Sequence, residues 1–168
     1  TQQYVREMVA YFKSKDSTRC VNYVSNTLGL IKNKKDDATL YGDVAMWNEY
    51  LGLWQPCNDI PGRISEVNKI CKNKPLIITE FGLCEPHFSG GDERRKEILL
   101  DHIKMFNKAD KIQGYVWFSL NDYRTHVGEQ GEGKLRQRVH GSTDLYGNKK
   151  PSYNTLCEVN ANQIEKHI

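Results

Sequence analysis

The chain has 168 residues and a mass of 19.4 kDa, which is enough to bury one sizeable hydrophobic core and predicts a single domain. Its hydrophobic content of 38%, charged content of 27% and mean hydropathy of −0.69 are typical of a soluble globular protein. The net charge of +3 is too small to indicate a nucleic-acid or anionic-membrane partner, and no apolar stretch approaches the roughly 20 residues of a membrane span.

The amino terminus has no basic segment followed by an apolar one, so no signal peptide is predicted. We expect a cytoplasmic location, and a secreted or periplasmic one stays open. Thr1 falls inside a predicted helix, and we therefore expect the chain to be a piece of a longer polypeptide.

The cysteines are odd in number and scattered along the chain. No C-x-x-C pair is present, which favours buried or free thiols over a zinc site or a redox couple. The five residues are Cys20, Cys57, Cys71, Cys84 and Cys157.

Helix and strand signals alternate from the start of the chain. Val5, Met8 and Phe12 share one face of a first predicted helix. Strands are predicted at 19–25, 43–50, 75–80 and 113–119.

Further helices are predicted where apolar residues recur at helical spacing. One begins at Ile60, with Pro61 near its start, where proline is tolerated. Another carries Ile98 and Met105 on one face, and a last helix begins at about Ser152 after a long glycine-rich loop.

Strands that alternate with helices predict an α/β fold with a parallel sheet. Each predicted strand ends in polar or aromatic residues, and in (β/α) barrels that end of the strands carries the active site. Any single one of these groups can instead cap a helix or satisfy a turn, but four in succession favour a binding cleft. They are Ser25-Asn26, Asn48-Glu49-Tyr50, Glu80 and Asn121-Asp122-Tyr123.

Four segments resemble the closing half of the catalytic barrels of glycoside hydrolase family 2, which includes β-galactosidases, β-glucuronidases and β-mannosidases. The segments are "NEYLG" (48–52), "KPLIITEFG" (74–82), "GYVWFSLNDYRT" (114–125) and "VHGSTDLYGNKKPSY" (139–153). The resemblance covers essentially the whole chain. It implies that residues 1–168 form the C-terminal half of a (β/α)8 TIM barrel, about its last four βα units.

The resemblance implies that Glu80 is the nucleophile of a retaining glycosidase, which attacks the anomeric carbon and forms a covalent glycosyl-enzyme. Tyr50 is then placed to donate a hydrogen bond to that carboxylate, and Asn48 to contact sugar hydroxyls. Trp117 would form an apolar platform beneath the sugar ring, with core packing as the alternative. Trp54 matches a further substrate-binding position only loosely, because many relatives place a tryptophan directly after the glycine. No cofactor and no metal is implied.

A retaining mechanism needs a second carboxylate about 5–5.5 Å from the nucleophile. In the family it lies in an N-E motif that ends the fourth barrel strand, so it is expected upstream of Thr1. The only N-E pair in this chain is Asn48-Glu49, and Glu49 is expected to point away from the site, because neighbouring strand residues face opposite sides. We therefore expect the isolated chain to be inactive, with a missing half-barrel or self-association covering its open sheet edges.

The expected substrate is a β-galactoside. Relatives specific for glucuronides carry an N-x-K motif after the last strand, whereas the matching stretch "GKLRQRVHG" (133–141) has Arg136 and Arg138 but no such motif. Asn148 and Lys150 form one further along, where a hairpin tip is favoured.

Two alternatives stay open. The chain can be a non-catalytic carbohydrate-binding or scaffold module of barrel origin, or belong to another retaining family of the same barrel clan, such as a cellulase-like enzyme. An N-E motif at a strand end just upstream of Thr1 favours the enzyme.

Overall fold

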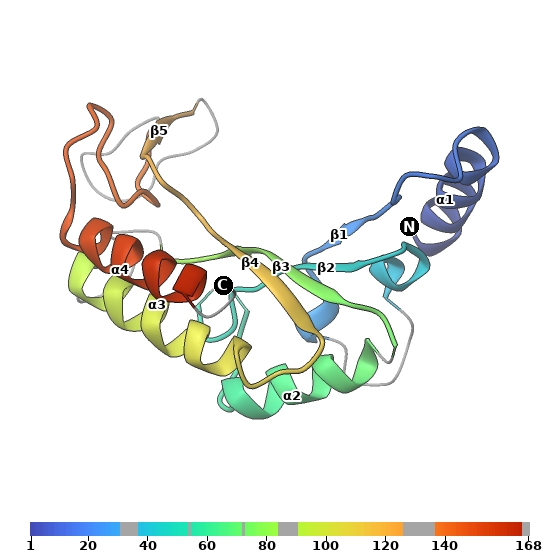
Figure 1. Ribbon diagram of the computed structural model, residues 1–168, viewed down its shortest axis with the longest axis horizontal. Coiled ribbons are helices and arrows are strands. Elements are labelled where there is room, and N and C mark those ends of the chain that lie inside the picture. Colours follow the sequence, from blue (N-terminus) through green and yellow to red (C-terminus); the bar gives the residue numbers. More distant parts are fainter. Residues whose placement is uncertain (31–36, 54, 72, 84–90, 126–136, 166–168) are drawn as a thin grey trace. The chain divides into compact units, whose positions relative to one another are not determined.

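The structure is a computed structural model that describes residues 1–30, 37–53, 55–71, 73–83, 91–125 and 137–165 (Figure 1). Trp54, Cys84 and Arg136 lie outside these residues. The helices are α1 (Gln2–Lys15), α2 (Ile60–Ile70), α3 (Gly91–Phe106) and α4 (Pro151–Glu165), with short 3-10 helices η1 (Leu28–Leu30) and η2 (Ala38–Tyr41). The strands are β1 (Val24–Ser25), β2 (Ala45–Asn48), β3 (Leu76–Phe81), β4 (Ile112–Trp117), β5 (Tyr123–Arg124) and β6 (Gln137–Arg138).

The chain divides into two compact units. The first unit contains Thr1–Phe81 and Met105–Val116, and the second contains Gly82–Lys104 and Trp117–Ile168. The predicted nucleophile Glu80 therefore belongs to the first unit and Trp117 to the second.

The first unit is built on a four-stranded sheet in the order β1-β2-β3-β4. β1 pairs with β2, and β2 with β3, in parallel. The predicted α/β class, the parallel sheet and the order of the strands along it are confirmed. β1 and β4 are the edges of this sheet, and each carries an exposed apolar residue: Val24 is 42% exposed and Val116 is 52% exposed.

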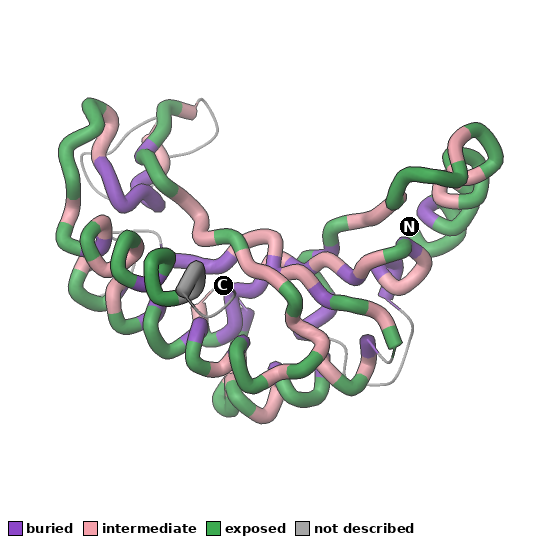
Figure 2. Tube along the Cα trace, in the orientation of Figure 1, coloured by how far each residue is buried: buried purple, intermediate pink, exposed green. Residues whose placement is uncertain are grey.

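The buried face of the sheet explains why these segments are strands. Ala45 and Trp47 in β2, and Leu76 and Ile78 in β3, alternate with less buried neighbours and are fully buried (Figure 2). Phe81 continues this core and packs edge-on against the rings of Phe106 and Tyr115. These apolar strands hold the polar residues at their ends in place.

The helix α2 lies beside the sheet of the first unit (Figure 1). Its first turn is closed by Asp59, whose carboxylate accepts a hydrogen bond from the Gly62 N–H over 2.9 Å. Ile64 and Val67 form its buried face, as the helical spacing of the apolar residues predicts.

The second unit holds most of α3 together with α4 and the antiparallel pair β5–β6. α3 and α4 run side by side in Figure 1. Ser152, at the start of α4, donates its backbone N–H to Asp92 in the first turn of α3 over 2.6 Å. This bond joins the beginnings of the two helices.

Two sequence predictions differ from the structure. The predicted strand 19–25 is reduced to Val24–Ser25, because Thr18 and Val21 bond instead to the carboxylates of Asp16 and Asp43. The segment predicted as a single long loop contains the pair β5–β6, whose two-residue strands are too short to give a periodic signal.

The thiols of Cys20, Cys57, Cys71 and Cys157 are free, and only Cys71 is buried, which agrees with the prediction for these four cysteines. Among the described helices, none is both long and apolar enough to cross a membrane.

Candidate active site

Asn48 and Glu80 lie opposite each other at the carboxyl ends of two neighbouring parallel strands. The pairing between β2 and β3 slips by one residue at this point, because Trp47 pairs with Ile78 and Asn48 with Glu80. Thr79 is the extra residue. Strict alternation would place Glu80 on the buried face of Ile78, but the slip leaves Glu80 half-buried and puts Phe81 in the core.

The side chain of Glu80 is held by a tyrosine from the neighbouring loop. The Tyr50 hydroxyl donates a hydrogen bond to Glu80 Oε2 over 3.0 Å, as the resemblance implied. The backbones of the two strands are joined at the same level, since the N–H of Glu49 donates to the Glu80 carbonyl over 2.8 Å. Glu80 is thus bonded to the loop after β2 by its side chain, through Tyr50, and by its backbone, through Glu49.

A tight turn holds Tyr50 in this position. Its carbonyl accepts the N–H groups of Leu53 and Gln55, both over 3.1 Å. Gly52 supplies the left-handed conformation that the turn requires, with φ of +77°, which residues with a Cβ rarely adopt. Tyr50 itself is 9% exposed, so most of its ring is packed and only a small part reaches solvent.

Asn48 is oriented by a side chain of β3. The Thr79 hydroxyl donates to Asn48 Oδ1 over 2.7 Å. The amide oxygen is therefore engaged with the protein, and the amide N–H groups are the part of Asn48 directed to other partners. This makes Asn48 a hydrogen-bond donor at the edge where Glu80 lies.

Gln55 ties together the ends of two strands of this sheet. Its side-chain N–H group donates to the carbonyl of Asn26 over 2.7 Å, and more weakly to that of Asn48 over 3.4 Å. Ser25 and Thr27, near the end of β1, both donate to the buried carboxylate of Asp37 over 2.8 Å. The polar side chains at the end of β1 are thus hydrogen-bonded to other groups of the protein.

Glu49 is buried, and its carboxylate bonds to the loop that follows β2. Its Oε1 accepts the N–H of Leu51 over 2.7 Å. Since this carboxylate already bonds the loop that follows β2, we assign it a structural part in shaping the turn that presents Tyr50.

Trp117 ends β4 and belongs to the second unit. It is half-buried, and its indole N–H donates to Ser142 Oγ over 3.0 Å. Downstream, Asp122 accepts a hydrogen bond from Lys150 Nζ over 2.8 Å, and its carboxylate also accepts the Gly141 N–H over 2.9 Å. Lys150, which the sequence places in a hairpin tip, is therefore engaged in an internal ion pair.

The structure brings together three of the residues singled out in the sequence: Asn48, Tyr50 and Glu80. Trp54 lies outside the described residues. Sequence reasoning missed Thr79 and Gln55, although the position of Thr79 directly before Glu80 was a signal that it borders the site.

No three His, Cys, Asp or Glu side chains within the described part of the chain are grouped to hold a metal ion. The donors gathered around Glu80 are a phenol, an amide and a hydroxyl. Such a set suits the recognition of hydroxyl-rich organic ligands better than that of a cation.

A family model described as glycosyl hydrolase catalytic core matches residues 47–145. This range contains Asn48, Tyr50, Glu80 and Trp117. A comparison with curated protein sequences finds no match.

Solved structures with the same fold include a glycoside hydrolase family 2 β-galacturonidase from Eisenbergiella tayi bound to galacturonate. It is 19% identical, with a TM-score of 0.73 over 92% of this chain and 29% of that one. A β-D-glucuronidase from Dictyoglomus thermophilum is 19% identical, with a TM-score of 0.73 over 94% of this chain and 28% of that one. A putative β-galactosidase from Bacteroides fragilis is 15% identical, with a TM-score of 0.74 over 90% of this chain and 24% of that one.

The chain therefore spans between 24% and 29% of the length of these proteins. Nearly the whole chain is matched in each comparison, so the similarity is to one part of each larger protein. The resemblance read from the sequence is confirmed: the chain belongs to the glycosyl hydrolase catalytic core family.

Proposed function

We propose that residues 1–168 are the C-terminal half of the (β/α)8 catalytic barrel of a retaining β-glycosidase, with Glu80 as its nucleophile. The observation that carries this proposal is the Tyr50–Glu80 hydrogen bond at the carboxyl edge of a parallel sheet. This is the edge at which barrel enzymes assemble their active sites.

In the proposed mechanism, a Glu80 carboxylate oxygen attacks the anomeric carbon as the bond to the leaving group breaks, which forms a covalent glycosyl-enzyme. Tyr50 holds the carboxylate by its hydroxyl and so limits the orientations from which it attacks. Water then cleaves the glycosyl ester and regenerates the carboxylate.

Asn48 and Trp117 are proposed to bind the sugar. The Asn48 amide N–H groups donate to sugar hydroxyls, because its oxygen is already bonded to Thr79. The Trp117 indole offers a flat apolar surface to the C–H groups of the sugar ring. Trp54 remains a further candidate for substrate contact.

The acid/base carboxylate is proposed to come from a segment upstream of Thr1, and to lie about 5–5.5 Å from Glu80 in the complete enzyme. Glu49 is a poor candidate for this role, because it is buried and bonded to the loop after β2. The isolated chain is accordingly proposed to be inactive.

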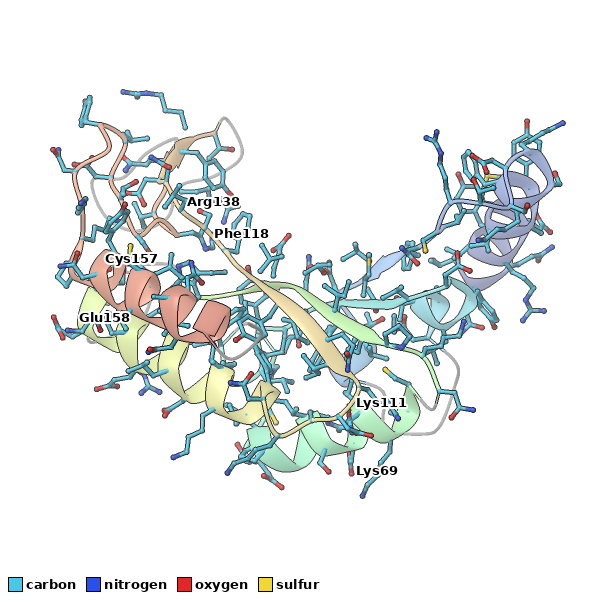
Figure 3. All side chains as sticks on the ribbon, viewed as in Figure 1. Lys69, Lys111, Phe118, Arg138, Cys157 and Glu158 are labelled. Atoms are coloured by element: carbon cyan, nitrogen blue, oxygen red, sulfur yellow. The ribbon has the colours of Figure 1, made fainter. Side chains whose placement is uncertain are left out.

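The preferred substrate class is a β-galactoside, since the chain lacks the N-x-K motif before Val139. A β-uronide is a second candidate, because two of the three structures described above are named a galacturonidase and a glucuronidase. The cationic Arg138 in β6, paired with Tyr123 in β5, is a residue that could bind a sugar carboxylate (Figure 3).

Turnover by the complete enzyme tests the proposal. Glu80→Gln keeps the shape and removes the nucleophile, so kcat and kcat/KM should fall together by about a thousandfold or more. Glu66→Gln, which alters an exposed carboxylate paired with Arg63, is the matched control and should keep wild-type rates. A Glu80→Gln enzyme with wild-type turnover would contradict the nucleophile assignment.

The substrate class is tested separately with aryl β-galactosides, β-glucuronides and β-galacturonides. A preference for the neutral sugar supports the first candidate. A preference for a uronide that Arg138→Gln abolishes supports the second. Binding of glycosides without turnover of any of them would favour the non-catalytic module.

A further inference from the structure

Trp117 is the first member of a chain of hydrogen bonds that runs into the buried part of the second unit. Its indole N–H donates to Ser142 Oγ over 3.0 Å, and Ser142 Oγ lies 3.2 Å from Ser152 Oγ. Ser152 Oγ donates in turn to Asp92 Oδ1 over 3.0 Å. Both serines are 0% exposed, so this chain has no contact with bulk water along its middle.

The two serines are joined through their hydroxyls, with Ser152 as the donor, since its Oγ donates to Ser142 Oγ over 3.2 Å. The same hydroxyl lies 3.0 Å from Asp92 Oδ1, so its single proton serves two acceptors. Ser142 Oγ accepts from both the Trp117 indole and Ser152, and its position therefore depends on Ser152 and, through Ser152, on Asp92.

At the Asp92 end, the row of hydrogen bonds is anchored by a fully buried arginine. Asp92 forms an ion pair with Arg95 and also accepts the Ser152 backbone N–H over 2.6 Å. Arg95 is 0% exposed, and its remaining N–H groups donate to the carbonyls of Leu83 and Val139 over 3.1 and 2.7 Å. The carboxylate is thus held by partners from both α3 and α4 and has little freedom to move.

Stability alone is a weak reason for such an arrangement, because apolar side chains of similar volume often replace a buried ion pair without loss. What the arrangement does supply is a fixed orientation for one aromatic ring. The indole N–H lies in the plane of the ring, so a hydrogen bond to it restrains rotation of the plane while covering neither face.

We infer that Ser142, Ser152 and Asp92 are positioning residues that orient the indole of Trp117 for stacking against a sugar ring. This inference rests on the proposed function of Trp117 as a sugar platform. We expect a change at Ser152 to alter the orientation of the Trp117 indole, although Ser142 lies between the two side chains and transmits the effect through its hydrogen bonds.

The indole N–H signals of the protein test this directly. In a ¹H–¹⁵N spectrum of protein labelled at the tryptophan Nε1, Trp117→Phe identifies the signal of Trp117 among those of the tryptophans. Ser142→Ala should move this signal upfield in ¹H and speed its exchange with solvent about tenfold, because it removes the acceptor. Ser152→Ala should also shift it, by a smaller amount, because Ser142 loses the donor that helps to hold its hydroxyl.

Thr143→Val is the matched control. It deletes a hydroxyl next to Ser142 that bonds the Leu120 carbonyl over 3.2 Å, outside the chain to Asp92. The Trp117 signal should stay at its wild-type position in this variant. If Ser152→Ala does not fold, Ser152→Cys keeps a weak donor and acceptor at the site and should give a smaller shift of the same sign.

In the complete enzyme, Ser152→Ala should also raise KM for an aryl glycoside severalfold with little change in kcat, because it loosens a binding surface rather than the nucleophile. An unchanged Trp117 signal in Ser152→Ala, or a shift with an unchanged KM, would overturn the inference. The spectrum needs no substrate. A failure of the proposed function would instead appear as a lack of turnover in the wild-type enzyme.

Discussion

The Tyr50 hydroxyl donates a hydrogen bond to Glu80 Oε2 over 3.0 Å, and so links the loop after β2 to the end of the neighbouring strand β3. The residue before Tyr50 is joined to Glu80 through the backbone, because Glu49 donates its N–H to the Glu80 carbonyl. A carboxylate held in this way is restrained before any ligand arrives, which is the property that an attacking group needs.

Removal of the Tyr50 hydroxyl should therefore slow catalysis by the complete enzyme. In Tyr50→Phe we expect kcat/KM to fall about tenfold to a hundredfold, since a hydrogen bond to a charged group contributes about 1.5–3 kcal/mol. Tyr41→Phe is the control: it also loses one bond, from Arg6 Nη2 over 2.8 Å, but at an exposed position. Equal activities of Tyr50→Phe and Tyr41→Phe would show that the Tyr50 bond has no catalytic part.

The contact between Thr79 and Asn48 predicts a second, smaller effect. Thr79→Val keeps the shape of the side chain but removes the hydroxyl that holds the Asn48 amide, so the amide can rotate. We expect kcat/KM to fall about threefold to tenfold, consistent with the loss of one neutral hydrogen bond. Thr79→Ser retains the hydroxyl and should stay near the wild-type value. A loss of similar size in both variants would point to packing of the methyl group instead.

The placement of Asn48 and Glu80 at the ends of two strands was predictable from the sequence, and the reasons are local. The apolar runs ending in Asn48 and Glu80 indicated strands, and parallel strands bring their carboxyl ends to one edge. The one-residue slip at Thr79 was not predictable, because it depends on how β3 pairs with β2 and not on the periodicity of either strand. The bonds of Gln55 to two strand ends were likewise hidden, since they join positions that only the fold brings together.

The second unit was predicted less completely. The hydrogen bonds that link Trp117 to Asp92 connect residues up to 60 positions apart in the sequence. Nothing in the sequence distinguishes a serine in a buried hydrogen-bond network from a serine in a surface turn. The pairing of β5 with β6 was missed for the same reason that short strands in general are missed: two residues show no alternation.

Cys71 provides a pH-dependent test of the core of the first unit. Burial, together with the nearby Asp37 carboxylate, raises the pKa of the Cys71 thiol from 9.0 to about 11. Between pH 9 and 11 the unfolded chain releases a proton that the folded chain keeps. The contribution of Cys71 to the free energy of unfolding is therefore complete below pH 9 and declines as the pH rises towards 11.

Urea unfolding at several pH values measures this decline. The wild-type free energy of unfolding should fall more steeply above pH 9 than that of Cys71→Ala, by up to about 1.4 kcal/mol for each pH unit. Slopes and not absolute values are compared, because the alanine variant also leaves a cavity. Parallel slopes would contradict burial of the thiol.

The exposed edges of the sheet predict self-association of the isolated 168-residue chain. Val24 in β1 and Val116 in β4 are apolar and exposed on strands with an unpaired side. Sedimentation should show a mass that rises with concentration, and Val116→Lys should reduce this rise. Leu100→Lys, which changes an exposed leucine of α3, is the control and should have less effect. A monomer at all concentrations would count against an open sheet.

The most direct test of Glu80 as the nucleophile is to trap the proposed covalent intermediate. The complete enzyme is treated with an activated 2-deoxy-2-fluoro-β-glycoside of the preferred sugar, and the labelled peptide is identified by mass spectrometry. We expect one adduct per active site, on Glu80 within residues 74–82, and no adduct in Glu80→Gln. An adduct on a different carboxylate, or full turnover by Glu80→Gln, would contradict this expectation.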